Sequence, residues 1–137
     1  METFPIPRLD ATQLRALAES SPLTGCEECG ALNCPGWEAM SAAFDESRLR
    51  RLGHLAAHGG NEMEPEPTFA EHHPDGTRYW SANAPIAIEY FPYNRCEVWA
   101  CRRCSRAFLR YTEYGGYYVE PRIRLLDPAL LSRADMT

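Results

Sequence analysis

The stretch Val98-Trp-Ala-Cys101-Arg-Arg-Cys104-Ser-Arg-Ala-Phe108 decides how the fold is interpreted, because it places two cysteines on one tight turn between two apolar segments. A second pair with the same spacing, Cys26-Glu-Glu-Cys29, lies nearer the amino terminus and is followed by Gly30. Two thiolates of one C-x2-C turn bind an ion at roughly 2.3 Å, and two such pairs supply the four ligands of a closed tetrahedral zinc site. We therefore predict a structural zinc ion bound by Cys26, Cys29, Cys101 and Cys104.

The turn around Cys101 resembles the zinc knuckle of zinc ribbons, in which one strand enters the turn and another leaves it. Gly30 fits the same pattern, because the residue after such a turn commonly needs to tolerate positive φ. Residues 30 to 100 separate the two pairs, a longer interval than in short ribbons. A shared metal would therefore join the early part of the chain to its later part and stabilise the fold.

Cys34 and Cys96 lie outside the two pairs and complete a mirrored pattern, C-x2-C-x4-C followed by C-x4-C-x2-C. One hypothesis is that both bind a second metal together with His54 and His58, which are one helical turn apart. The alternative is that they are buried apolar residues, as free cysteines commonly are. We favour the alternative, because positions 96 and 101 of one strand point to opposite faces. The two histidines are then expected in solvent at a helix end.

The cysteine pairs and the other motifs do not indicate catalysis. Two glutamates between Cys26 and Cys29 disfavour a reactive thiolate, which argues against a redox role. The sequence contains no Gly-rich phosphate loop, no G-x-S-x-G and no H-E-x-x-H. A four-cysteine zinc site has no open coordination position and is a poor Lewis acid. We therefore expect that the protein is not an enzyme.

Composition and charge restrict the class of protein. The chain has 137 residues, 45% hydrophobic and 24% charged, which predicts a single zinc-stapled domain over residues 1–137. It has no apolar stretch of membrane-spanning length and no secretory signal, so we expect a cytoplasmic location and reduced thiols. Its 14 basic residues are all arginine, and 19 acidic residues bring the net charge to −5. Such a chain is a poor general ligand for nucleic-acid phosphates.

The hydrophobic pattern predicts helices first and strands later. A first helix begins at the N-cap Asp10 and ends at 20–22, and a longer one covers 37–58, where apolar residues recur at helical spacing. From residue 78 the spacing changes to two, which predicts strands at 78–82, 86–91, 96–101, 107–114 and 117–125. Gly115-Gly116 is expected to form a hairpin turn, and Pro121 to interrupt the last strand or mark an edge. The predicted fold class is α+β, with two helices packed on an antiparallel β-meander and stapled by a zinc-ribbon-like site of four cysteines.

Residues 61–76 form an acidic, Pro-rich loop with five acidic residues, three prolines and no arginine. This composition predicts an irregular surface segment. An acidic surface attracts basic protein partners and accelerates their association. The candidate partner-binding residues are therefore Glu62, Glu64, Glu66, Glu71 and Asp75. The alternative is that the segment is only a solvated connection.

Segment 95–124 supports a different hypothesis, in which the sheet binds nucleic acid. It interleaves seven arginines with six aromatic residues, and arginine beside exposed rings can stack bases. Strand alternation offers an ordinary alternative, in which the aromatic face packs on the helix and the arginines lie in solvent on the other face. The contacts of the nucleic-acid hypothesis would be Arg102, Arg103 and Arg106.

The run from Trp99 to Arg124 carries Cys101-Arg-Arg-Cys104 and then Phe108-Leu-Arg-Tyr-Thr-Glu-Tyr-Gly-Gly-Tyr-Tyr118. It resembles a small bacterial family in which a C-x2-C knuckle precedes the same motif, a resemblance that implies no activity. In size and charge the chain also loosely resembles bacterial immunity proteins, which neutralise a toxin by occluding it. This resemblance implies a zinc-stabilised module that binds a cognate toxin and thereby inhibits it. The part of the toxin that it binds would be a basic domain. The alternative function is a zinc-ribbon regulator that binds nucleic acid.

Overall fold

The computed structural model describes residues 7–22, 24–55, 68–115 and 117–131. Helix α1 (Ala11–Ser20) begins after the N-cap Asp10, as the sequence predicts. The Asp10 carboxylate accepts a hydrogen bond from the Gln13 N–H (2.8 Å), and the Gln13 side chain accepts one from the Asp10 N–H (2.9 Å). This capping box satisfies two free donors at the start of the helix. Leu14 and Ala18 are buried one turn apart and attach α1 to the core.

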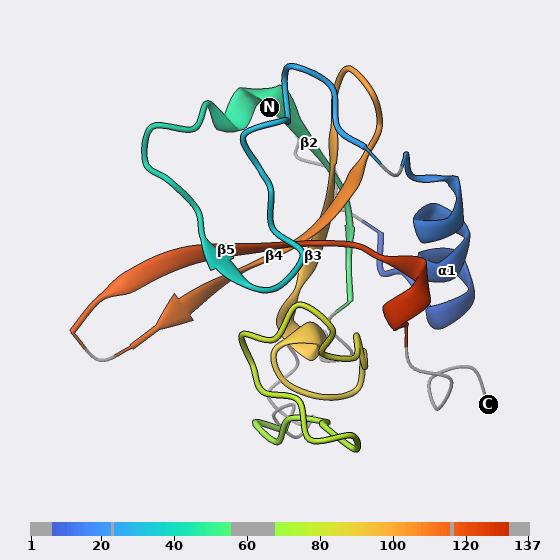
Figure 1. Ribbon diagram of the computed structural model, residues 1–137, viewed down its shortest axis with the longest axis vertical. Helices are drawn as coiled ribbons and strands as arrows, with labels where there is room; N and C mark the ends of the chain where they lie inside the picture. Colours follow the sequence, from blue (N-terminus) through green and yellow to red (C-terminus); the bar gives the residue numbers. More distant parts are fainter. Residues whose placement is uncertain (1–6, 23, 56–67, 116, 132–137) are drawn as a thin grey trace.

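The described residues also form a five-stranded antiparallel sheet with the strand order β1-β5-β4-β3-β2. In chain order the strands are β1 (Glu38–Ala39), β2 (Leu49–His54), β3 (Glu97–Cys101), β4 (Ala107–Tyr114) and β5 (Val119–Leu125). β2 to β5 pair consecutively, which confirms an antiparallel meander and the α+β class, and β1 pairs with β5. Figure 1 shows the β4–β5 hairpin extending away from the side that carries α1.

The predicted helix over 37–58 is wrong, and α1 is the only α-helix within the described ranges. Residues of that interval instead form β1, the 3-10 turn η1 (Glu46–Arg48) and β2. The apolar residues belong to both faces of the sheet: Trp37 packs in one core cluster and Met40 and Leu49 in the other. Their helix-like spacing therefore reflects two burial environments and not one helical stripe. His54 accordingly ends a strand, and His58 lies outside the described residues.

The later strands are predicted with mixed success. The strand at 107–114 is confirmed as β4, and those at 96–101 and 117–125 are confirmed as β3 and β5 with slightly later starts. The strands at 78–82 and 86–91 are wrong, because these segments form turns whose apolar side chains pack on the core without a ladder. Pro121 does not interrupt β5, where it lies opposite Thr112. The β4–β5 connection covers residues 115–118, where the Gly115 N–H donates to the Tyr118 carbonyl at 2.9 Å.

Both faces of the sheet are covered, because successive strand residues point in opposite directions and each set meets a packed layer. Leu109 and Tyr111 point to the face on which α1 and the segment 79–93 pack. Phe108 points to the other face, where side chains from 26–34 and 40–44 pack. The layer that packs on the Phe108 face contains Cys26 and Cys29 and so brings this cysteine pair to the sheet. Within the described ranges, no helix has both the length and the apolar character needed to cross a membrane.

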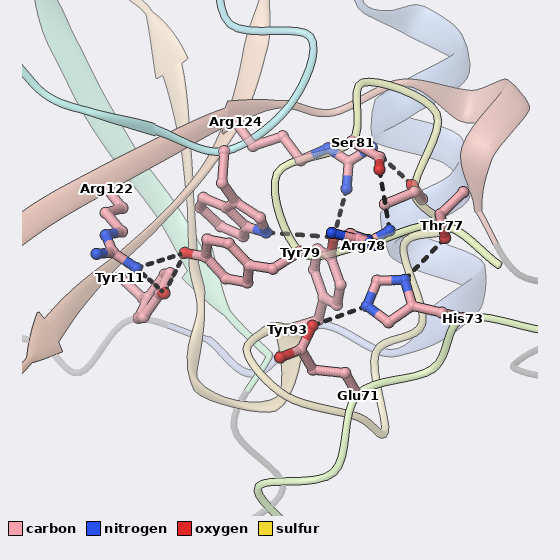
Figure 2. A network of polar contacts seen from close by, with 12 residues as sticks. Glu71, His73, Thr77, Arg78, Tyr79, Ser81, Tyr93, Tyr111, Arg122 and Arg124 are labelled. Carbon is pink, nitrogen blue, oxygen red and sulfur yellow. Dashed lines mark hydrogen bonds and ion pairs between the residues drawn. The ribbon is translucent and has the colours of Figure 1, made fainter.

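Three arginines of β4 and β5 are buried, contrary to the expectation that arginines on this sheet would lie in solvent. Arg110, Arg122 and Arg124 expose 9%, 8% and 0% of their surface. Arg122 forms ion pairs with Glu113 and Glu120, each at 3.2 Å. It also donates to the Tyr79 hydroxyl at 3.1 Å (Figure 2). Because both faces of the sheet are covered, the alternation of side chains along these strands does not separate a buried face from a solvent-exposed face.

Candidate metal centre

The two C-x2-C pairs come together at one end of the sheet. Cys26 and Cys29 lie in the loop between α1 and β1, Cys101 ends β3, and Cys104 lies in the β3–β4 turn. Figure 1 shows this loop beside this turn at the top of the view. The four sulfur atoms lie within 4.8 Å of one another, so that the group can hold a metal ion. The structure thus brings together all four residues that the sequence predicts as ligands.

The distances between the sulfur atoms fit a shared ion. The Cys26 and Cys101 sulfurs are 3.6 Å apart, as are those of Cys29 and Cys104. Four sulfurs at about 2.3 Å from a tetrahedral zinc ion are roughly 3.8 Å from one another, so the observed arrangement needs only small adjustments. A disulfide requires about 2.05 Å between its sulfurs, and all six cysteines are free.

The backbone of the two turns explains why these residues fit there. The Ser105 N–H donates to the Cys101 carbonyl at 2.9 Å, and Ser105 adopts a left-handed conformation with φ 69°. Gly30, which we expected to have positive φ, does not. Its role is close approach, because a Cβ at this position would lie 3.0 Å from the Cys26 carbonyl oxygen. A Cβ at Gly25 would lie 2.9 Å from the Cys29 sulfur, so both glycines give the first turn its space.

The thiols of the first pair have opposite pKa shifts. Burial raises the pKa of Cys26, but hydrogen bonds from the Cys29 and Glu28 backbone and from the Cys101 and Cys104 thiols lower it to about 7. Burial, with a further contribution from the same two thiols, raises the pKa of Cys29 to about 12. The Cys26 and Cys29 thiols therefore do not ionise together by themselves. A bound cation would compensate the negative charges and release the protons.

Contacts from η1 hold both cysteine turns. The Arg48 Nε lies 3.3 Å from the Glu28 carboxylate, and the Arg48 Nη1 donates to the Glu28 carbonyl at 3.2 Å. The Arg102 N–H donates to the Arg48 carbonyl and its Nε to the Ser47 carbonyl, both at 2.9 Å. Cys29 and Cys101 are buried and the other two sulfurs are partly buried. The arrangement is thus a partly buried cluster of four sulfurs suited to a structural ion.

The remaining cysteines lie apart from this site and from each other. Cys34 belongs to the same core cluster as Phe108, and its thiol donates to the Leu32 carbonyl. Cys96 is fully buried in the opposite cluster, and its thiol donates to the Pro92 carbonyl. Burial raises the pKa of Cys34 to about 12 and raises that of Cys96 well above its usual range. Within the described residues neither forms a second group of metal ligands with His54.

Replacing either of these cysteines by alanine is expected to leave the metal content unchanged. Cys34→Ala and Cys96→Ala each remove one buried atom, which costs on the order of 1 kcal/mol of unfolding free energy, like a deleted methylene. Zinc analysis and denaturant unfolding of the purified variants measure both quantities. A parent protein with about two zinc ions per chain that loses one in either variant would instead establish a second site.

Only part of the proposed acidic partner surface lies within the described residues. Glu62, Glu64 and Glu66 lie outside the described residues. Glu71 accepts a hydrogen bond from the His73 ring at 2.7 Å (Figure 2), and Asp75 is exposed. These two residues lie on one irregular segment, as the sequence predicts. Whether the five acids act together remains a prediction.

Sequence reasoning missed a second site, a groove of about 650 Å³ on the sheet. Its lining includes Trp99 of β3, Tyr114 of β4 and Phe69. The sequence pattern did not reveal the groove, because β3–β5 and residues 69–95 are distant in sequence. Parts of residues 69–95 were also expected to form strands.

No protein family model, curated protein or solved structure matches this chain. The residues themselves therefore carry the functional argument, and the strongest of them are the four converging cysteines.

Proposed function

We propose that the protein is a zinc-stabilised module that binds another protein, and that its most concrete form is a cytoplasmic immunity protein that occludes a basic toxin domain. The convergence of four thiols from two distant segments within 4.8 Å carries the zinc part of this proposal. Thiolate-rich, closed tetrahedral sites favour zinc in a structural role.

The position of the zinc explains what it would do. The loop with Cys26 and Cys29 has no regular secondary structure from residue 24 to residue 37. It nevertheless covers one face of the sheet through Leu32 and Cys34. An ion shared with Cys101 and Cys104 would fix this loop to the sheet without requiring the loop to bury much apolar surface. The metal would therefore stabilise a surface and take no part in a reaction.

The distribution of charge supports a protein partner over nucleic acid. Three of the seven arginines in 95–124 are buried, namely Arg110, Arg122 and Arg124, and are withdrawn from contact with phosphates. Arg102 and Arg103 remain exposed, but both lie at the cysteine turn, where Arg103 faces Glu28 at 3.9 Å. The net charge of −5 opposes phosphate binding in addition. These observations favour a basic protein over a nucleic acid.

Reversing the acidic loop is expected to slow association with the partner without unfolding the protein. The variant replaces Glu62, Glu64, Glu66, Glu71 and Asp75 by lysine. Complementary charges steer encounter over about 10 Å, so the loss should be largest at low salt. The partner is first identified by copurification from the native host and mass spectrometry, and association rates are then measured across a salt series.

The same variant is measured against a short single-stranded oligonucleotide. Removing five acids should strengthen phosphate binding if nucleic acid is the true ligand. Unchanged zinc content and melting temperature serve as the control for folding. An unchanged rate with the protein partner at every salt concentration would show that the loop is only a solvated connection.

A further inference from the structure

The β4–β5 hairpin extends beyond the rest of the sheet and leaves part of one edge of β4 unpaired. The β3–β4 ladder ends at the pair formed by Glu97 and Arg110. Before Glu97 the chain forms the 3-10 turn η2 (Tyr93–Arg95) and does not extend the ladder. β4 nevertheless continues to Tyr114, so among the described residues its last part has a paired strand on the β5 side alone. Figure 1 shows the hairpin projecting from the molecule.

The unpaired backbone groups of this edge belong to Thr112 and Tyr114. The Gly115 N–H donates to the Tyr118 carbonyl at 2.9 Å, and hydrogen-bonded pairs of an antiparallel ladder alternate with pairs that are not bonded. Thr112 and Tyr114 therefore belong to pairs without hydrogen bonds, and their N–H and C=O groups point away from β5. Pro121, opposite Thr112, likewise directs its carbonyl away from β4, where it accepts a hydrogen bond from the chain just after β1. Among the described residues, neither Thr112 nor Tyr114 has a backbone hydrogen-bond partner on the open side.

The two outer strands of the sheet are protected against pairing, whereas this edge is not. Proteins block edge strands with lysine, proline, bulges or covering segments, because an unpaired edge can pair with another chain. β5 is covered by β1 next to Pro121, which has no N–H to donate. β2 has a register shift between Arg51 and Gly53, and the segment before α1 hydrogen-bonds to its end at His54. The chain contains no lysine, and residues 111–114 of β4 have neither a proline nor a bulge.

Large exposed side chains adjoin the open edge and form a tyrosine tip, which consists of Tyr114, Tyr117 and Tyr118. These residues are 74%, 104% and 49% exposed, and Val119, the ladder partner of Tyr114, is 65% exposed. An aromatic side chain presents roughly 150–250 Å², so the four side chains offer about 500 Å² of exposed surface. An exposed apolar patch of a few hundred Å² commonly marks an interaction site. A standard interface buries about 800 Å² on each partner, so the tip and the edge together fit a weak dimer contact.

The groove beside this edge does not select a charged ligand. Thr112 and Tyr114 line it. Each of its three carboxylates already pairs with an arginine of this chain, in the pairs Glu46–Arg110, Glu97–Arg51 and Glu113–Arg122. The backbone donors and acceptors of β4, in contrast, remain unpaired. An extended chain can satisfy them by adding a strand, whatever its net charge.

We propose that two copies of this chain pair along the open edge of β4, antiparallel and related by a two-fold axis, with their tyrosine tips in contact. Such an edge is self-complementary, because a two-fold axis brings each N–H of one copy to a C=O of the other. Thr112 and Tyr114 supply two donors and two acceptors in each copy. The groove beside Thr112 leaves room for side chains of the second copy. This proposal goes beyond the proposed function and does not depend on it.

Sedimentation equilibrium of the purified protein measures this association directly. A contact of this size gives a weak dimer, with a dissociation constant expected on the order of 10 µM. Added salt should strengthen the dimer or leave it unchanged, because both copies carry a net charge of −5 and the strand pairing uses no ion pair. A parent protein that stays monomeric up to about twenty times this concentration would overturn the proposal. A dimer that salt dissociates would be held by ion pairs and would overturn it as well.

Two variants locate the contact. Thr112→Pro removes an outward N–H and no hydrogen bond of the hairpin, and Pro121 already occupies the opposite position in β5. It should weaken the dimer about tenfold or more, because one hydrogen bond is lost on each copy. Thr112→Val keeps the N–H and the branched side chain and is the matched control, which should dimerise like the parent. Tyr114→Ser removes an exposed ring and should also weaken the dimer about tenfold.

The outcomes separate this proposal from the proposed function. A dimer that neither Thr112→Pro nor Tyr114→Ser weakens would use another surface and would overturn the edge pairing. If Thr112→Pro lowers the melting temperature, Tyr114→Ser decides the question alone. A monomeric parent whose copurified partner no longer binds the Thr112→Pro variant would show that the edge receives a strand of that partner, and the second copy would be wrong. None of these results changes the zinc content or the association of the parent with its partner, on which the proposed function depends.

Discussion

Replacing Cys101 by serine is expected to cause a large loss of thermal stability together with loss of the metal. The purified parent should hold about one zinc ion per chain, since four thiolates complete a tetrahedral site. Structural zinc contributes an apparent 10–16 kcal/mol in small zinc domains, about as much as the whole stability of an ordinary domain. A weakened site should therefore lower the melting temperature by roughly 10 °C or more. Zinc analysis and thermal unfolding measure the two effects.

Cys34→Ser is the matched control, because it makes the same chemical change at a buried cysteine outside the site. It should destabilise the protein moderately while zinc remains bound. A chelator should reproduce the effect of Cys101→Ser in the parent and should have little further effect on the variant. Metal-free parent protein with an unchanged melting temperature would show that the four thiols are only packed together.

The features that could be predicted from the sequence depend on short contiguous signals. The helix at Asp10 is defined by a cap and by Gln13 three residues later, both within its first turn. β3 and β4 flank a C-x2-C turn, so that the turn itself fixes where one strand ends and the next begins. The four metal-ligand candidates follow from the chemistry of two such turns. Each signal acts locally and does not depend on what covers the sheet.

The interval 37–58 could not be predicted because tertiary packing decides it. The β2–β3 ladder shifts register between Arg51 and Gly53. Residues three apart on a strand point to opposite faces, and Leu49 accordingly packs on one face and Leu52 on the other. Apolar residues three apart are also the signature of a helix. The spacing alone therefore does not distinguish a helix with one buried stripe from a bulged strand covered on both sides.

The groove and the buried arginines escaped prediction for a related reason. Arg122 and Arg124 alternate along β5, which fits a solvated face. That face is covered by the segment 79–93, whose turns contribute Tyr79 and Tyr93 to the arginine contacts. Sequence alternation shows which residues share a face. It does not show whether an irregular segment will pack over them.

Among these buried arginines, Arg124 is expected to matter most for stability. Its replacement should cost about 3 kcal/mol or more of unfolding free energy. The side chain is fully buried, and among the described residues it has no carboxylate partner. Its Nε donates to the Pro35 carbonyl at 3.1 Å and its Nη2 to the Ala84 carbonyl at 2.6 Å. Its Nη1 donates to the Tyr93 hydroxyl (Figure 2). One planar group thus joins β5 to the parts of the chain around Pro35, Ala84 and Tyr93.

Arg124→Met removes the buried charge, and this removal alone would favour folding. It also leaves the Pro35, Ala82 and Ala84 carbonyls without this donor, while the Tyr93 hydroxyl keeps the hydrogen bond from the Trp37 Nε1. Each buried acceptor without a partner costs about 1–3 kcal/mol, so the loss of the donors outweighs the relief of the charge. Arg124→Lys keeps the charge, yet one ammonium group cannot replace a fork that donates in three directions, and it should also destabilise. Denaturant unfolding measures the loss, and Arg50→Met, an exposed arginine of β2, should change stability by less than about 0.5 kcal/mol. If Arg124→Met unfolds at the same denaturant concentration as the parent, the arginine does not hold these segments together and the carbonyls find other donors.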